Sequence, residues 1–76
     1  MVTRYKFRGT LYKVENDRGI LSHLKSAYAV EKYVSGREDI DSLMVRYMYS
    51  DDAGVGECVE PVTEFIQRYH EGRILP

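Results

Sequence analysis

The sequence has little of what would commit a short chain to one environment. Among its 76 residues there is a single cysteine, Cys58. One cysteine excludes an internal disulfide, so nothing covalent would stabilise the fold in an oxidising compartment, and we expect a cytoplasmic protein. No segment approaches the roughly 20 consecutive apolar residues that span a bilayer, and no apolar leader follows Met1. We therefore expect no membrane association.

A strong net charge is also lacking, because the formal total is −1. A polyanion is attracted over a distance by a large net charge, so any contact with nucleic acid would have to be local. The two halves nevertheless differ in sign. Residues 1–37 contain eight Lys/Arg and three Asp/Glu, whereas residues 38–76 contain three Lys/Arg and nine Asp/Glu. This polarity predicts either neutralisation between the halves, within one chain or in a self-associated pair, or two surfaces of opposite charge.

Residues suited to catalysis or metal binding are scarce. Nucleophilic catalysis needs a Ser or Cys beside an oriented base, and the two imidazoles, His23 and His70, each have a structural explanation. Three scattered Cys/His residues do not make a structural zinc site. The acidic segment 51–57 lacks the ligand spacing of an EF-hand, and its carboxylates would repel a phosphate despite Gly54 and Gly56. We expect no enzymatic activity, no cofactor and no metal.

The hydrophobic pattern is typical of a small folded domain. With 43% hydrophobic residues, the chain is expected to form one compact domain over residues 1–76 with a modest core. Alternation over residues 3–14 predicts one long strand, and the turn residues Asn16–Gly19 lead into a second strand at about 19–25. The predicted hairpin register sets Val14 opposite Leu21, Tyr12 opposite His23 and Leu11 opposite Leu24. The alternative for residues 19–25 is a helix, because their apolar residues also fit a helical stripe.

Two helices and a third strand complete the expected fold. Ser26 is a good N-cap for a helix over Ala27–Val34 that ends at Gly36. The apolar residues Leu43, Val45, Tyr47 and Tyr49 predict a strand, and the turn residues of 50–56 predict a loop. Pro61 begins the second helix, whose apolar stripe is Val62, Phe65, Ile66 and Tyr69. The predicted class is α+β, in the order ββαβα, with a mainly antiparallel three-stranded sheet and both helices on one face.

The most distinctive pattern is the alternation of cations with apolar residues in the first strand. Successive side chains of a strand point to opposite faces, so a continuous strand would present its cations on one face and turn its apolar residues into the core. The apolar residues concerned are Tyr5, Phe7 and Leu11. With Tyr12 on the cationic face and Lys13 close by, the predicted basic contact surface consists of Arg4, Lys6, Arg8, Tyr12 and Lys13.

An acidic contact surface is the alternative. The second half of the chain can present carboxylates to a basic groove of a partner, where phosphates would otherwise lie. The residues chosen for this surface are Asp51, Asp52, Glu57 and Glu60. Three tyrosines, Tyr12, Tyr28 and Tyr33, are expected to be partly exposed, and exposed tyrosine beside arginine and methionine is typical of contact surfaces.

We recognise no family motif in the sequence, so the functional hypothesis is based on surface chemistry alone. We predict a non-enzymatic binding module that regulates or inhibits a macromolecular partner, most simply a protein, by occupying its surface. Small phage-encoded inhibitors of host machinery offer an analogy at the level of class. The alternative is nucleic-acid binding through the basic, tyrosine-bearing strand. A homodimer is a separate hypothesis, because one short chain has a small core.

Overall fold

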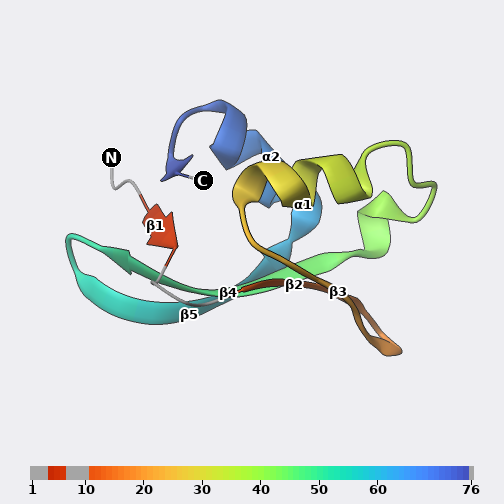
Figure 1. The fold of residues 1–76 in the computed structure, drawn as a ribbon, viewed down its shortest axis with the longest axis horizontal. Coiled ribbons are helices and arrows are strands. Elements are labelled where there is room, and N and C mark those ends of the chain that lie inside the picture. The colour runs from red at the N-terminus through yellow and green to blue at the C-terminus, as the bar shows by residue number, and fades with distance from the viewer. Residues whose placement is uncertain (1–3, 7–10, 76) are drawn as a thin grey trace.

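The computed structural model describes residues 4–6 and 11–75 (Figure 1). These residues form two α-helices and six strands, with a short 3-10 helix at Ile40–Ser42. The elements are β1 (Arg4–Lys6), β2 (Tyr12–Asn16), β3 (Gly19–Leu24), α1 (Ala27–Val34), β4 (Met44–Asp51), β5 (Gly54–Pro61), α2 (Val62–His70) and β6 (Ile74–Leu75). Both helices lie on the same side of the sheet (Figure 1).

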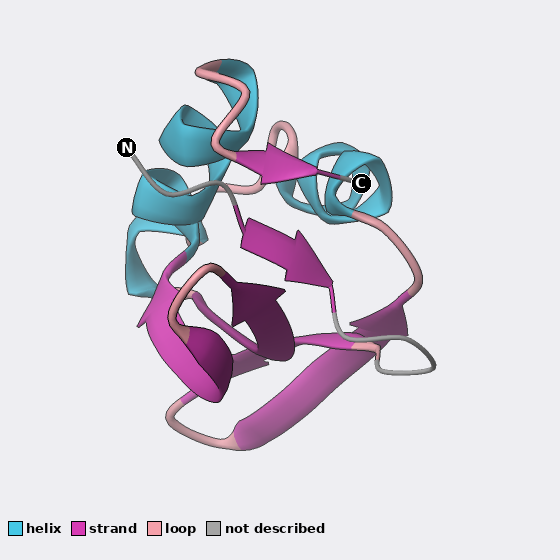
Figure 2. Ribbon diagram, turned by 90° about the vertical axis from the view of Figure 1, so that its left-hand side faces the viewer, coloured by secondary structure: helices cyan, strands magenta, loops and turns pink. Residues whose placement is uncertain are grey.

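Strand β4 is the centre of the sheet. Strand β5 pairs antiparallel with it from Met44–Pro61 to Asp51–Gly54, and β2 and β1 pair with different parts of its other edge. Strand β3 pairs with β2, and β6 pairs in parallel with β1 (Figure 2). The predicted α+β class, with two helices and an antiparallel sheet, is confirmed. The predicted three strands and ββαβα order are wrong, because the longer elements include four strands in the order ββαββα.

Strand β5 is the strand that the sequence prediction did not include. Residues 50–56 were expected to form a loop, but only Asp52 and Ala53 form the turn, and β5 already begins at Gly54. Asp51 accepts a hydrogen bond of 2.8 Å from the Ala53 amide, and Gly54 has a φ of +125°, a conformation that favours glycine. The turn residues thus make a tight hairpin in place of a long loop.

The first strand is interrupted, contrary to the prediction of one strand over residues 3–14. Lys6 pairs with Tyr49 and Lys13 with Arg46. Lys6 and Lys13 are seven positions apart in the sequence, whereas their partners on β4 are only three positions apart. One continuous ladder cannot contain both pairs. Phe7 and Arg8, which were assigned to this strand, lie outside the described residues, and the side chains of Tyr5 and Lys6 are not described.

The predicted hairpin of β2 and β3 is confirmed, and the helical alternative for residues 19–25 is wrong. Its register differs by one residue from the prediction, since Tyr12 pairs with Leu24 and Lys13 with His23. The register shifts between Val14 and Glu15, so Ile20 pairs with Glu15. Such a bulge changes which side chains share a face, and the hydrophobic pattern alone does not reveal it.

The core lies between the sheet and the two helices, and aromatic rings form its centre. The rings of Tyr12, Tyr47 and Phe65 contact one another, with centroids 5.1 to 5.3 Å apart. All three side chains are buried. The expectation that Tyr12 is partly exposed is therefore wrong, because it shares the inner face of β2 with Val14. Tyr28 and Tyr33 are partly exposed, as expected.

Both helices form where the sequence predicts them. The Ser26 hydroxyl accepts a hydrogen bond of 3.0 Å from the Ala29 amide at the N-terminus of α1. Helix α2 begins directly after Pro61 and buries Val62 and Phe65. The chain then turns at Gly72, whose φ is +75°, and this turn returns β6 to the edge of β1.

Candidate functional site

The side chain of Arg4 lies on the helix side of the sheet, among core tyrosines. Its Nη1 donates hydrogen bonds of 3.3 Å to the Tyr47 hydroxyl and to the Cys58 sulfur. The guanidinium also lies over the ring of Tyr49, 4.5 Å from its centroid. The expected solvent-facing position of Arg4 on a basic ladder is therefore wrong. The alternation correctly places Arg4 and Tyr12 on the same side, but that side is the inner one.

Arg4 is tolerated there because Glu60 of β5 meets it. The Glu60 carboxylate is only 5% exposed and lies 3.8 Å from Arg4 Nη1, and it also forms an ion pair with Arg68 of α2. The Tyr47 hydroxyl donates a hydrogen bond of 2.6 Å to the same carboxylate. Glu60 was assigned to an exposed acidic surface, and its burial contradicts that position. A buried charge is stable only when it is paired in this way.

This polar cluster of Arg4, Tyr47, Cys58, Glu60 and Arg68 keeps its hydroxyl and thiol protonated. Burial raises the pKa of Tyr47, and the hydrogen bond to Glu60 raises it further. Burial also raises the pKa of the Cys58 thiol, and the negative charge of Glu60 acts in the same direction. A thiol with a raised pKa is a poor nucleophile at neutral pH. The cluster therefore has the character of a structural network.

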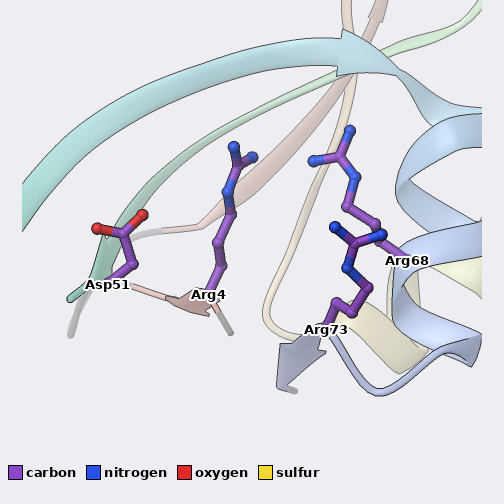
Figure 3. Close-up of a pocket in the computed structure, with 4 residues that line it drawn as sticks. All are labelled: Arg4, Asp51, Arg68 and Arg73. Carbon is purple, nitrogen blue, oxygen red and sulfur yellow. The ribbon is translucent and has the colours of Figure 1, made fainter. Parts of the chain in front are cut away.

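A hollow opens beside this cluster, between β1, the end of β4, and the α2–β6 segment. Its volume is about 540 Å³, and among the described residues it is lined by Arg4, Asp51, Arg68 and Arg73 (Figure 3). The guanidinium groups of Arg68 and Arg73 lie near each other, with Arg4 between them and Asp51 (Figure 3). We call this hollow the arginine pocket.

Two backbone contacts bring these arginines together from the two ends of the chain. The Arg73 amide bonds to the Arg68 carbonyl at 2.9 Å, and the Arg4 amide bonds to the Arg73 carbonyl at 2.9 Å. Sequence reasoning missed Arg68 and Arg73. In the sequence, two cations near a helix C-terminus are explained by their favourable interaction with the helix dipole. Only the pairing of β1 with β6 places them beside Arg4.

The other residues predicted for the basic surface do not join this pocket as far as they are described. Lys13 lies on the outer face of the sheet, where it pairs with Arg46 and His23. Arg8 lies outside the described residues, and the side chain of Lys6 is not described. Nucleic-acid binding by the basic strand stays a prediction, but Tyr12 is buried and Arg4 points inward.

The four residues of the predicted acidic surface occupy different places. Asp51 lines the arginine pocket, and Asp52 is exposed in the β4–β5 turn. Glu57 is exposed on the outer face, where its carboxylate lies 3.4 Å from Arg46. Glu60 is on the inner face and buried. They do not form one continuous surface, and contact of any of them with a partner stays a prediction.

The outer face of the sheet carries exposed apolar side chains. No described helix covers this face (Figure 1). On β4 and β5 this face consists of residues that alternate with the buried ones, and Val55 is 60% and Val59 41% exposed. Met48 lies opposite Glu57, between these two valines, and Met44 lies opposite Pro61; both are partly exposed. Arg46 stands in the same row, and Glu15 at 3.1 Å and Glu57 at 3.4 Å neutralise it. The result is an apolar strip with a locally compensated charge, which we call the outer strip.

The described residues show no arrangement that unites the three candidate catalytic side chains. His23 lies on the outer face of β3, Cys58 faces the polar cluster, and His70 of α2 contacts Glu31 of α1. Residues 4–6 and 11–75 also hold no group of three or more His, Cys, Asp or Glu that could bind a metal ion. None of the helices in this part of the chain has the length and apolarity to cross a membrane.

Comparisons with known proteins add no relative to this description. No protein-family model matches the chain, and neither the curated proteins nor the solved structures contain a significant match.

Proposed function

We propose that this chain is a non-enzymatic binding module that regulates or inhibits a protein partner by occupying its surface. The observation that carries the proposal is the exposed edge of β5 next to the outer strip. Strand β5 has eight residues, pairs with β4 along its full length, and has no second neighbour among the described strands. An unpaired edge offers a row of backbone donors and acceptors to an extended partner segment.

The chemistry of β5 defines the partner segment. It contains no Lys or Arg, although lysine is a usual protection of exposed edges. Its exposed charged residue is Glu57, since Glu60 is buried and paired with Arg4 and Arg68. On the outer face the side chains alternate Val55, Glu57 and Val59, so a strand that pairs with this edge would place its own side chains opposite them. A complementary segment alternates apolar residues with Lys or Arg. The adjacent turn, with Asp52, extends the negative charge.

A second copy of the chain is a less favourable occupant of this edge. Antiparallel pairing of two β5 strands would bring the exposed Glu57 of both copies into one short ladder, and neither strand contributes a cation. Like charges on facing strands destabilise a pair. We therefore propose a basic partner segment rather than a β5-mediated homodimer.

A peptide titration tests the chemistry of this edge. The amide signals of the full chain are followed by NMR while a peptide of alternating valine and lysine is added, and a peptide of alternating valine and glutamate is the matched probe. The expected result is a saturable shift of β5 amides with the lysine peptide only. Saturation by both peptides, or by neither, would argue against a basic strand as the partner.

Two substitutions at similarly exposed residues test which surface contacts the partner. Val55→Lys adds a cation at the edge, whereas Tyr28→Lys adds one on α1, where Tyr28 is 52% exposed against 60% for Val55. The V55K variant is expected to lose binding of the lysine peptide and of any partner purified from the native source, and the Y28K variant is expected to retain both. If Y28K abolishes partner binding and V55K does not, the contact surface is α1 and the proposal fails.

A further inference from the structure

We propose that the arginine pocket binds the phosphate group of a small, hydroxyl-bearing molecule. This site is independent of the proposed function, because the pocket lies on the helix side of the sheet and the outer strip on the opposite side. Three observations carry the inference: unused guanidinium donors, the balance of charge in the pocket, and the acidic residues around it.

The three arginines make few contacts for the donors that they possess. Arg4 uses only Nη1 in its contacts with Tyr47, Cys58 and Glu60, and Arg68 uses only Nη2 in its ion pairs with Glu60 and Glu64. Arg73 uses Nη1, which donates a hydrogen bond of 3.2 Å to Glu71.

Each guanidinium thus keeps Nε and one terminal nitrogen free of partners among the described residues. Arg73 Nε is also buried and has no hydrogen-bond partner there. A buried donor without an acceptor is unfavourable. Because Arg73 Nε is buried, an added acceptor would reach it only if the side chain turned toward the hollow. In Arg4 and Arg73 the remaining Nε and Nη2 are the paired donors of an arginine fork, which match two oxygens of a phosphate, whereas in Arg68 Nη2 is already paired with Glu60.

The charge balance of the pocket also favours an anion. Its described lining contains three arginines and one aspartate. Glu60 compensates part of this charge but is shared by Arg4 and Arg68. Glu64 pairs with Arg68 and Glu71 with Arg73, but these two carboxylates are 62% and 44% exposed, so solvent weakens their compensation. A phosphate monoester carries up to about two negative charges and three acceptor oxygens, which suits a hollow lined by three guanidinium groups.

The surroundings argue for a small molecule over a nucleic-acid strand. A volume of about 540 Å³ lies within the range of small-molecule pockets and leaves room for more than the phosphate itself. Asp51 in the lining can accept hydrogen bonds from hydroxyl groups of the ligand. Glu64 and Glu71 stand beside Arg68 and Arg73, and these carboxylates would repel the neighbouring phosphates of a continuous strand.

The test follows the Nε–H signals of the arginines by NMR in the full chain. Inorganic phosphate, a ribose phosphate and a mixed-sequence single-stranded oligonucleotide are titrated separately at constant ionic strength, with chloride as the reference salt. The expected result is a saturable shift at Arg4, Arg68 and Arg73 with both small phosphates, with the ribose phosphate the tighter binder. No saturable shift with either, or equal shifts with chloride, would overturn the proposal. Tighter binding of the oligonucleotide at the same signals would also overturn it and assign the pocket to nucleic acid.

A matched pair of arginine variants supplies the control. Arg73 is 38% and Arg37 34% exposed, and each pairs with a nearby carboxylate. Arg37, however, donates both Nε and Nη2 to Asp39 and has no fork to offer. Arg73→Gln is expected to weaken the affinity for ribose phosphate about tenfold or more, and Arg37→Gln less than about twofold.

Arg73→Lys keeps the charge and removes the fork, so an intermediate affinity is expected. If R73Q does not fold, the R73K variant still measures how much the Arg73 side chain contributes to the affinity. Equal affinity losses in R73Q and R37Q would show a general charge effect and refute the site. Full affinity in R73K would refute the role of the Arg73 fork and leave only its charge as the recognised feature.

Discussion

The hydroxyl of Tyr47 donates a 2.6 Å hydrogen bond to Glu60, a carboxylate that is 5% exposed. The same hydroxyl accepts a hydrogen bond of 3.3 Å from Arg4 Nη1. Tyr47 therefore joins β1, β4 and β5 through one oxygen atom, while Arg68 links the same carboxylate to α2. The short β1 is held in the fold by this cluster as well as by its few backbone pairs.

Removal of the Tyr47 hydroxyl should measurably destabilise the protein. Tyr47→Phe keeps the ring in the aromatic core and removes the bond to Glu60, and a hydrogen bond to a charged group contributes about 1.5–3 kcal/mol. We expect the free energy of unfolding, measured with urea, to fall by about 2 kcal/mol. The control is Tyr28→Phe, which removes an exposed hydroxyl and should change it by less than about 0.5 kcal/mol. Equal effects in the two variants would show that the buried bond is unimportant.

The two glutamates that contact Arg68 should differ strongly in their effect on stability. Glu60 is 5% exposed and is shared with Arg4, whereas Glu64 is 62% exposed and lies 3.8 Å from Arg68. Loss of one partner of a buried pair leaves the other charge uncompensated. We expect Glu60→Gln to lower the free energy of unfolding by about 3 kcal/mol. Glu64→Gln should lower the free energy of unfolding by less than about 0.5 kcal/mol in the same urea experiment. A similar decrease in both variants would show that Glu60 is effectively exposed to solvent.

The pattern of neighbouring residues was sufficient to predict the elements that such residues determine. The cap at Ser26, the stripe that buries Val62 and Phe65, and the two-residue turn before Gly19 are each determined by neighbouring residues. The apolar face of β4 likewise follows directly from alternation. These features made the class and most of the chain predictable.

Strand β5 could not be predicted in the same way, and the error spread from there. Its glycines and acidic residues have low strand propensity, and the strand exists because β4 offers it a full-length partner. Without β5 there was no reason to place Glu60 inside. Without a buried Glu60, Arg4 had no partner on the core side, so its alternation was interpreted as a solvent-facing ladder. The arginine pocket was hidden for the same reason, since its residues meet only through long-range pairing.

Stability should fall in alkaline solution because the core tyrosines resist ionisation. Burial raises the pKa of Tyr12 from 10.0 to about 12. Between these values the unfolded chain releases a proton that the folded chain retains, so the unfolded state gains stability as the pH rises. The urea midpoint should therefore be level below about pH 10 and decrease toward pH 12. In Tyr12→Phe the decrease should be shallower, and an unchanged slope in that variant would show that Tyr12 does not contribute to it.

The Cys58 thiol should react slowly in the folded protein, because its pKa is raised by burial and by the nearby Glu60 carboxylate. Thiolate is the reactive form, so alkylation by iodoacetamide at mildly alkaline pH should be slower in the native chain than in the chain unfolded by urea. Glu60→Gln removes the negative neighbour and should accelerate the native reaction in part, since burial is the larger cause.

Loss of stability alone could also expose the thiol, and a second variant separates the two effects. Tyr47→Phe is expected to be destabilised to a similar degree, but it keeps the carboxylate that lies 3.4 Å from the Cys58 sulfur. If the charge of Glu60 acts on the thiol, E60Q reacts faster than Y47F at matched stability, which a low urea concentration can adjust. Equal rates at matched stability would mean that opening of the fold, rather than the carboxylate, controls the reaction of Cys58.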